Sequence, residues 1–177
     1  KSNLIEVWPN LELFIHGGIS FEPYRDQYQS LIPKAGMRYM ETYNASEGFF
    51  GIQDQPHSDE MLLMLDYGIY YEFMSMEEYG KDFPDTLSLE QVQLNKNYAL
   101  VISTNSGLWR YLIGDTIRFT SLNPYRIKIT GRTKLFINAF GEEVMIENAH
   151  NAVKIASEKT GALIKDYTVA PVYFSES

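Results

Sequence analysis

A short apolar run, a pair of glycines and a helical pattern follow one another within the first 32 residues. Residues 11–15 predict a buried strand, which ends in His16, Gly17 and Gly18. The glycines permit positive φ and a close backbone approach to a ligand, and residues 24–32 carry apolar side chains at helical spacing. α/β proteins use such a strand–glycine–helix unit to place a ligand at the carboxyl ends of their strands. An ordinary strand-to-helix turn is the alternative interpretation of the same pattern.

A second motif follows the next predicted strand, at residues 37–43. The strand runs into the hexapeptide Tyr43-Asn44-Ala45-Ser46-Glu47-Gly48. Small and polar residues between a strand and a glycine predict a loop where backbone amides and the Ser46 hydroxyl can face a ligand. A Glu47 carboxylate beside such donors is a natural place to hold a divalent metal on a phosphate. The alternative is a turn whose serine and glutamate merely satisfy local backbone donors.

A glycine and an aspartate interrupt the β pattern that dominates the middle of the chain. Residues 98–104, 108–119 and 125–130 predict strands, and Gly114 and Asp115 lie inside the second of these runs. Both residue types are unfavourable within a sheet, and such local violations tend to mark functional sites. We predict a bulge that turns Asp115 out of the ladder into a cleft. An exposed hairpin turn is the alternative, because Gly-Asp is also turn chemistry.

Further strand and helix patterns divide the chain. Residues 61–65 and 69–73 predict two strands joined across a tight turn, and a helix is predicted to end at Gly161. Strand periodicity breaks between two charged residues at 131–135. We therefore predict a hinge at 131–135, which separates a domain at 1–130 from the start of another at 136–177.

Composition excludes several classes of function. Acidic residues outnumber basic residues by 23 to 15, and the net charge of −8 argues against non-specific nucleic-acid binding. Cysteine is absent, so the chain has no disulfide and no thiolate zinc site. Its three histidines, His16, His57 and His150, lie far apart in the sequence without ligand spacing. No apolar run approaches the ~18 residues of a membrane helix. Without a signal-peptide pattern or an initiator Met, we expect an internal piece of a longer, cytoplasmic protein.

Three motifs stand in a fixed order: Tyr-Asn-Ala-Ser-Glu-Gly, Arg-Tyr-Leu-Ile-Gly-Asp-Thr and Gly-Arg-Thr-Lys-Leu-Phe-Ile-Asn-Ala-Phe-Gly-Glu-Glu. Their order and spacing resemble the adenylate-forming superfamily of acyl-CoA ligases, peptide-synthetase adenylation domains and luciferase. Within it, the Ser-Glu-Gly-Phe-Phe-Gly and Gly-Asp-Thr-Ile-Arg-Phe forms are most similar to one family. This family is the auxin-responsive acyl-acid amido synthetases of the Gretchen Hagen type, and we expect a bacterial member. The resemblance covers most of the chain.

The resemblance implies both an architecture and an activity. The fold would be mixed α/β, with residues 1–130 as the C-terminal part of the large domain, including a β-barrel-like subdomain. Residues 136–177 would begin the small C-terminal domain. The activity would use ATP and Mg²⁺ to convert a carboxylic acid into an acyl-adenylate, from which an amino acid takes the acyl group as an amide.

The resemblance also implies a role for each matching residue of the nucleotide site. Glu47 would hold Mg²⁺, and the Ser46 hydroxyl would touch the α-phosphate together with the backbone amides nearby. The nucleotide would also be lined by Tyr43, stacked on the adenine, by Asn44 and Ala45, and by the backbone of His16, Gly17 and Gly18 as the opposite wall.

The later motifs would contribute three further residues. Asp115 would accept hydrogen bonds from both ribose hydroxyls, and Arg132 would reach the ribose or the phosphates. The resemblance makes Arg132 a catalytic residue together with Glu47 and Ser46. Lys134 would lie at the pivot of the small domain. The alternatives are an exposed ion pair for Arg132 and a solvated side chain for Lys134.

Two departures from the family pattern matter. The Ser/Thr/Gly-rich phosphate loop is absent, and no lysine matches the catalytic lysine found late in the small domain. We therefore expect little or no turnover from this piece alone. Two rival functions stay open: a phenylacetate-type acyl-CoA ligase, which shares adenylation but uses a thiol acceptor, and a non-catalytic nucleotide-binding or interaction module.

Overall fold

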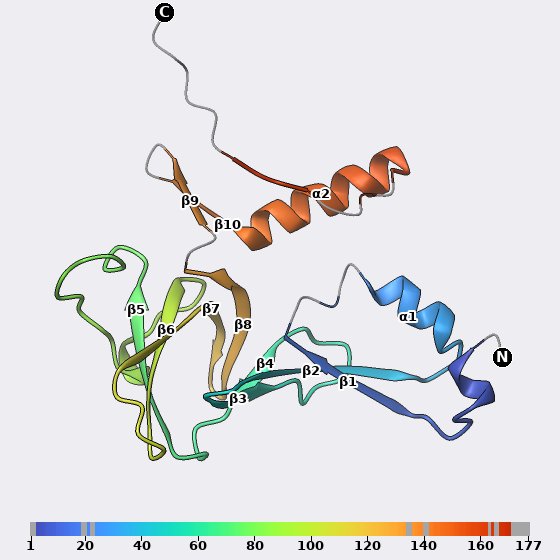
Figure 1. Cartoon of the computed structure of the whole chain (residues 1–177), viewed down its shortest axis with the longest axis horizontal. Coiled ribbons are helices and arrows are strands. Elements are labelled where there is room, and N and C mark those ends of the chain that lie inside the picture. Colours follow the sequence, from blue (N-terminus) through green and yellow to red (C-terminus); the bar gives the residue numbers. More distant parts are fainter. Residues whose placement is uncertain are drawn as a thin grey trace, which may run out of the picture. The chain divides into compact units, whose positions relative to one another are not determined.

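The structure is a computed structural model that describes residues 3–18, 21, 24–133, 136–139, 142–162, 164 and 167–170. Eight strands form one sheet in the order β1-β2-β3-β4-β8-β7-β6-β5, and β9 pairs with β10 in a second sheet (Figure 1). The mixed α/β fold predicted from the sequence is confirmed. The elements are η1 (Leu4–Glu6), β1 (Leu13–Gly17), α1 (Arg25–Leu31), β2 (Arg38–Ala45), β3 (Gly48–Ile52), β4 (Met61–Leu63), β5 (Ile69–Ser75), η3 (Leu89–Gln91), β6 (Asn97–Thr104), β7 (Tyr111–Leu122), β8 (Tyr125–Arg132), β9 (Phe136–Ala139), β10 (Glu142–Met145) and α2 (Ile146–Thr160).

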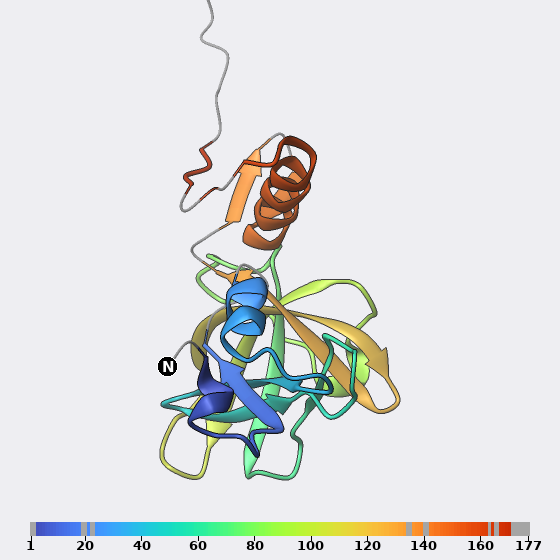
Figure 2. The same cartoon turned by 90° about the vertical axis from the view of Figure 1, so that its right-hand side faces the viewer.

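The chain divides into two compact units, each assembled from several segments. Unit 1 contains residues 1–70, 103–109 and 119–128, and unit 2 contains residues 71–102, 110–118 and 129–177. Within unit 2, α2 follows the β9–β10 hairpin and lies beside it (Figures 1 and 2). No helix among the described residues has the length and apolar character needed to cross a membrane. The hinge at 131–135 stays a prediction, since residues 134 and 135 lie outside the described part of the chain.

The predicted strand–glycine–helix pattern forms a β1–α1–β2 unit within unit 1. Strand β1 pairs with β2 in parallel, from Leu13 opposite Arg38 to Gly17 opposite Thr42. Parallel neighbours need a crossover connection, and α1 lies in that connection. The ring of Tyr28 on α1 packs against that of Phe14 on β1 with 4.8 Å between centroids, so this contact joins the helix to the strand, although no residue of α1 is fully buried.

Strands β4 and β5 do not form the hairpin that the sequence predicts, so this expectation is wrong. In the sheet, β4 pairs with β3 and with β8, whereas β5 is the neighbour of β6. The local sequence contains two apolar runs and a turn, but it does not specify which strands pair. Met61 and Leu63 are 2% and 3% exposed, in a strand that lies between the preceding strand β3 and the sequence-distant strand β8.

The core of unit 2 surrounds β6. Residues 98–102 are buried without interruption, the pattern of a strand covered on both faces. Beside it, Thr116 on β7 and Thr130 on β8 are 0% and 2% exposed. The Thr130 hydroxyl donates to the Thr116 hydroxyl at 3.0 Å, so these buried polar groups satisfy each other and hold β7 to β8.

Two ion pairs tie β8 to the segment between β3 and β4 in unit 1. The guanidinium of Arg126, whose side chain is 8% exposed, donates to both carboxylate oxygens of Asp54, with 3.0 Å between Nη2 and Oδ2. Lys128 Nζ lies 2.6 Å from Asp59 Oδ2. The Arg126 pair is bidentate, the geometry in which a guanidinium and a carboxylate interact most strongly.

Lowering the pH is expected to weaken unit 1 through the Arg126–Asp54 pair. The hydrogen bonds from Arg126 hold the pKa of the Asp54 carboxyl below its ordinary value of 3.8. A carboxyl with a depressed pKa in the folded state contributes stability that is complete above 3.8 and is lost as the pH falls through the folded-state pKa. Below about pH 4, the thermal unfolding midpoint should therefore fall more steeply for the wild type than for Asp54→Asn.

The exposed Asp66 in unit 1 supplies the control for this measurement. Asp66→Asn removes a carboxylate from the same unit without touching the Arg126 pair, and it should follow the wild-type curve. Parallel curves for the wild type and Asp54→Asn would contradict the prediction.

Candidate functional site

The carboxyl ends of β1 and β2 bring the His16-Gly17-Gly18 segment and the hexapeptide that begins at Tyr43 together in unit 1. Because the strands are parallel, these ends lie at the same edge of the sheet, with Gly17 opposite Thr42. The Thr42 hydroxyl is placed to donate to the His16 carbonyl at 3.3 Å and to Asn44 Oδ1 at 3.1 Å. We call Gly17, Thr42 and Asn44 the strand-end cluster.

A side chain at position 17 would collide with β2. A Cβ built on Gly17 lies 2.5 Å from the Thr42 carbonyl oxygen and 3.3 Å from Asn44 Oδ1, so only glycine permits this close packing. Gly18 has a φ of +87°, which residues with side chains rarely adopt. Both glycines and Asn44 are exposed. The cluster therefore presents backbone and a small polar side chain to solvent, a surface that a bulky ligand can approach closely.

Ser46 and Glu47 form the tip of the β2–β3 hairpin. Ala45 pairs with Gly48, so the predicted loop is a two-residue turn, with Ser46 exposed and Glu47 partly exposed. Mg²⁺ is commonly held by one or two carboxylates together with the phosphates of its substrate. Among the described residues, no group of three histidine, cysteine or acidic side chains could hold a metal by itself. The assignment of Mg²⁺ to Glu47 stays a prediction.

Tyr43 is buried whereas the next residue, Asn44, is exposed, at the step where the β2–β3 register shifts. Tyr43 is 4% exposed, and its ring packs against Phe50 with 4.9 Å between centroids. A ring buried to this degree offers little area to an adenine, so stacking by Tyr43 stays a prediction that would require the ring to move. The half-buried ring of His16 stacks on Phe21 with 4.0 Å between centroids, and the His16 carbonyl lies 3.3 Å from the Thr42 hydroxyl of the strand-end cluster.

The predicted bulge at Gly114 and Asp115 is present in unit 2. Ala99 of β6 pairs with Thr116 of β7, and Val101 pairs with Leu112. Between these two pairs, Leu100 alone opposes Ile113, Gly114 and Asp115. Strand β7 continues through this irregularity, so the alternative of an exposed hairpin turn is wrong. Gly114 has a φ of +93°, which explains why a glycine occupies the bend.

The bulge brings the Gly114-Asp115 motif and the Gly131-Arg132-Thr133 motif together in unit 2. The Gly114 carbonyl accepts hydrogen bonds from the Thr133 backbone N–H at 2.8 Å and from the Thr133 hydroxyl at 3.3 Å. Arg132 Nε lies 3.3 Å from Asp115 Oδ1, with the two side chains 60% and 18% exposed. We call Gly114, Asp115, Arg132 and Thr133 the bulge cluster.

The Asp115–Arg132 contact is an ion pair, the kind of interaction that we gave above as the alternative role of Arg132. An exposed pair of this kind contributes little to stability, about 0–1 kcal/mol. Its effect is to orient a carboxylate and a guanidinium side by side. A carboxylate only accepts hydrogen bonds and a guanidinium only donates them, so the pair can meet a diol and an anionic group of the same ligand.

Sequence reasoning missed some polar residues of both clusters. Thr42 has no motif signal of its own, since its importance comes from the parallel register with Gly17. Thr133 lies inside the third motif but had no assigned role, because its bond to the Gly114 carbonyl spans 19 residues. The predicted hinge residue Lys134 lies outside the described residues, so its role stays a prediction.

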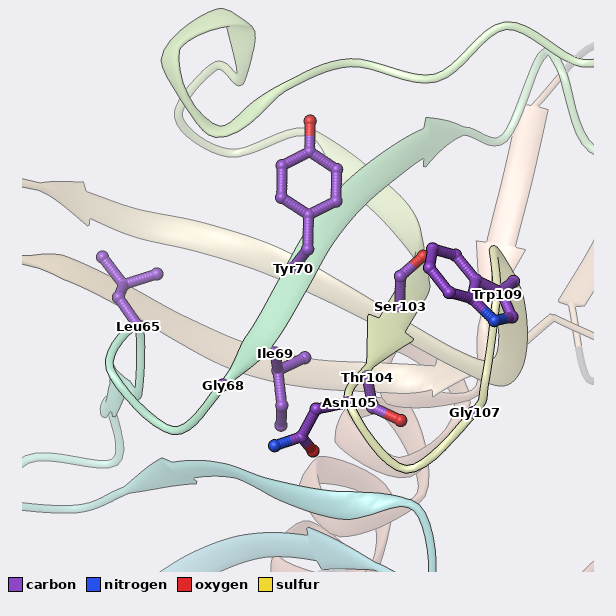
Figure 3. A pocket seen from close by; sticks show the side chains of 9 residues that line it. All are labelled: Leu65, Gly68, Ile69, Tyr70, Ser103, Thr104, Asn105, Gly107 and Trp109. Atoms are coloured by element: carbon purple, nitrogen blue, oxygen red, sulfur yellow. The ribbon is translucent and has the colours of Figure 1, made fainter.

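Unit 1 also contains an open pocket that no sequence motif indicated (Figure 3). Its volume is about 490 Å³, and its lining includes two exposed aromatic side chains, Tyr70 and Trp109. None of its lining residues belongs to the strand-end cluster. They are Leu65, Gly68, Ile69, Tyr70, Ser103, Thr104, Asn105, Gly107 and Trp109.

Comparison with known sequences connects the β-rich middle of the chain to one family. Residues 62–132 match the model of the GH3 family central domain. The chain is 27% identical over 180 residues to an indole-3-acetic acid-amido synthetase, GH3.4, of Arabidopsis thaliana. It is 28% identical over 180 residues to the 4-substituted benzoates-glutamate ligase GH3.12 of the same plant. These alignments cover 93% and 95% of this chain, which spans 30% of the length of each relative.

Comparison with solved structures gives the same fold. The GH3.15 acyl acid amido synthetase superimposes with a TM-score of 0.66 at 22% identity, covering 88% of this chain and 28% of that protein. A structure of AtGH3.15 in complex with 2,4-DB gives a TM-score of 0.66 at 19% identity, covering 96% of this chain and 35% of that one.

Proposed function

This chain carries a GH3 family central domain at residues 62–132, and from that premise we propose that the protein activates a carboxylic acid with ATP and transfers it to an amino acid. The family predicted from the three motifs is confirmed. In the first step the acid would attack the α-phosphate and release pyrophosphate. In the second, the amine would attack the acyl carbon and release AMP. Because the chain spans 30% of its relatives' length, the activity is proposed for the intact protein.

One observation supports a nucleotide site more than any other: the Asp115–Arg132 pair lies inside the matched family region. The bulge turns Asp115 out of the regular ladder, and the carboxylate lies 3.3 Å from the guanidinium. We assign Asp115 to the two ribose hydroxyls and Arg132 to the ribose or the phosphates. An acceptor-only group and a donor-only group side by side suit these two parts of a nucleotide.

For the strand-end cluster and the hairpin tip of unit 1, the nucleotide contacts that we propose come from the family resemblance. The backbone of Gly17 and Gly18 would form one wall, and Asn44, Ala45 and Ser46 would approach the α-phosphate. Bound Mg²⁺ would neutralise charge that develops on the phosphoryl oxygens. Glu47 is the residue that we propose holds the ion, so Glu47→Ala should raise the Mg²⁺ concentration needed for half-maximal activity.

Pyrophosphate exchange by the intact protein tests the first step. Labelled pyrophosphate should enter ATP only when a suitable carboxylic acid from a panel is present, because the reversal requires an acyl-adenylate. Release of AMP with amino acids, compared with coenzyme A, then identifies the acceptor. Faster release with coenzyme A would favour the acyl-CoA ligase. No exchange with any acid would contradict the proposed activity.

Three finer expectations accompany this proposal. Residues 1–177 alone are expected to show little or no turnover, because the phosphate loop and the late lysine are absent from this chain. We propose a cytoplasmic location, with which the absence of cysteine is compatible. The bacterial origin expected from the motif forms stays a prediction.

A further inference from the structure

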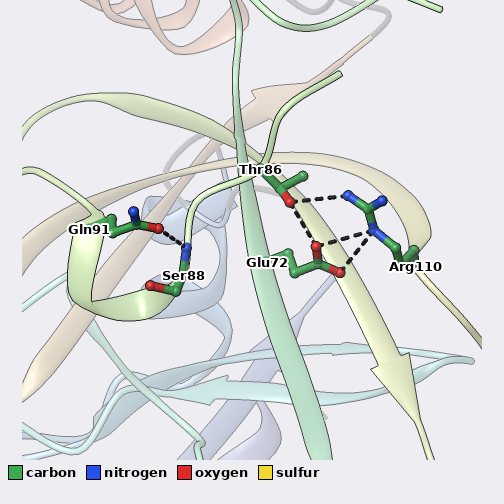
Figure 4. A network of polar contacts seen from close by, with 5 residues as sticks. All are labelled: Glu72, Thr86, Ser88, Gln91 and Arg110. Carbon is green, nitrogen blue, oxygen red and sulfur yellow. Dashed lines mark hydrogen bonds and ion pairs between the residues drawn. The ribbon is translucent and has the colours of Figure 1, made fainter. Parts of the chain in front are cut away.

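Arg110 is held by a closed triangle of polar contacts within unit 2 (Figure 4). Its Nε lies 3.1 and 3.2 Å from the two carboxylate oxygens of Glu72. Its Nη2 donates to the Thr86 hydroxyl at 3.1 Å, and that hydroxyl donates to Glu72 Oε1 at 2.7 Å. We call Arg110, Glu72 and Thr86 the arginine clamp.

The two partners of Arg110 lie on a rigid frame. Glu72 is on β5, and its side chain is only 14% exposed. Thr86 precedes Leu87, which exchanges two backbone hydrogen bonds with Phe73 of β5 at 2.8 and 2.9 Å. Glu72 and Thr86 are therefore fixed to the same strand, and the guanidinium binds to both through charge-assisted hydrogen bonds.

The backbone of Arg110 is strained. Its φ is +46°, in the left-handed region that non-glycine residues seldom occupy. Such a conformation persists only where the surroundings hold it, and it is often associated with function. An ion pair with one side chain 61% exposed adds little stability by itself. The clamp is therefore better explained by what it positions.

Arg110 directly precedes β7, whose starting register determines the composition of the bulge. Tyr111 pairs with Ile102 and Leu112 with Val101, after which three residues oppose Leu100. If β7 began one residue earlier or later, the bulge would contain a different number of residues. The side chains at its start would also exchange faces, and Asp115 would no longer be set beside Arg132.

We propose that the arginine clamp sets the starting register of β7 and thereby positions Asp115 for the nucleotide. The part of this inference that concerns ATP binding rests on the proposed function. The part that concerns the backbone register of β7 is independent of that function. Arg110, Glu72 and Thr86 are positioning residues, since the proposal assigns the nucleotide contact to Asp115 and none to the clamp itself.

The test compares variants of the intact protein by two readouts. Arg110→Asn removes the guanidinium but keeps a residue type that tolerates the left-handed conformation. Thr86→Val removes one corner of the clamp and serves if the arginine variant folds poorly. Lys96→Ala, an exposed cation of unit 2, is the matched control. The readouts are amide hydrogen exchange of residues 111–118 and the separate kcat and KM for ATP in pyrophosphate exchange.

The expected result is local and specific to nucleotide binding. Amide hydrogen exchange of residues 111–118 should accelerate about ten-fold in Arg110→Asn. The KM for ATP should rise on the order of ten-fold while kcat changes much less. Arg110→Lys, which offers a point charge instead of a fork, should restore part of both. Lys96→Ala should match the wild type.

Two results would overturn the inference. Unchanged amide hydrogen exchange of residues 111–118 in Arg110→Asn would show that the clamp does not set the register. Faster hydrogen exchange with an unchanged KM for ATP would show that the clamp does not position Asp115, provided that Asp115→Asn itself raises this KM. If Asp115→Asn leaves the KM unchanged, the proposed contact of Asp115 with the ribose fails, and the amide hydrogen exchange data alone then decide whether the clamp fixes the bulge.

Discussion

Asp115→Ala is expected to abolish most ATP binding by the intact protein while leaving its fold intact. The carboxylate is proposed to accept hydrogen bonds from two ribose hydroxyls, each worth about 1.5–3 kcal/mol when one partner is charged. Loss of both corresponds to a decrease in affinity of a hundred-fold or more, at about 1.4 kcal/mol for each ten-fold. Isothermal titration with ATP measures this decrease directly.

Stability separates loss of binding from loss of folding in this variant. The Asp115–Arg132 pair is exposed on the arginine side, so its removal should lower the free energy of unfolding by no more than about 1 kcal/mol. Asp82→Ala, an exposed aspartate of unit 2, is the matched control and should bind ATP as the wild type does. Wild-type affinity in Asp115→Ala would instead favour a non-catalytic interaction module that does not use this carboxylate.

Gly17→Ala is expected to destabilise unit 1 by about 1–3 kcal/mol, the usual cost of an overpacked contact. The new methyl group would lie 2.5 Å from the Thr42 carbonyl oxygen, a backbone atom that cannot move without disturbing the parallel pairing of β1 and β2. The end of β1 must therefore separate from β2. Thermal or urea unfolding of the variant measures the loss, and ATP binding should weaken with it.

A neighbouring position supplies the control for Gly17→Ala. Ile15 lies on the same strand and is 59% exposed, so Ile15→Val keeps a β-branched residue and should change stability by less than about 0.5 kcal/mol. If Gly17→Ala were as stable as Ile15→Val, the close packing of Gly17 against Thr42 would not exist in solution.

Local chemistry made several elements predictable. A glycine followed by an aspartate cannot continue a regular strand without disturbance, and a bulge occurs where the sequence places them. The hexapeptide that ends in Gly48 predicts a loop, of which the structure has a two-residue turn at Ser46 and Glu47. Helix α2 ends at Thr160, directly before Gly161, whose φ of +69° is the usual conformation after a helix. Each of these features depends on a few adjacent residues.

Which side chains of a strand face the core was harder to predict. Period-two alternation predicts that Tyr43 and Asn44 lie on opposite sides of β2, but nothing in the hexapeptide tells which side is the core. Packing of Tyr43 against Phe50 decided this, and it buried the ring that the family resemblance had assigned to adenine. The pairing of β4 also depends on tertiary structure, because one of its two partners, β8, lies far away in the sequence.

The sequence alone indicates the resemblance to the GH3 family, the mixed α/β class and the positions where glycine, turn and bulge chemistry interrupt regular structure. The interruptions can be predicted because they depend on neighbouring residues. Which of these positions meet follows from the tertiary structure. Gly17 reaches Thr42 through parallel pairing, Thr133 reaches Gly114 across 19 residues, and Arg110 reaches Glu72 across 38. Such contacts depend on strand register and packing, which are set by the burial of the whole sheet and by no single segment.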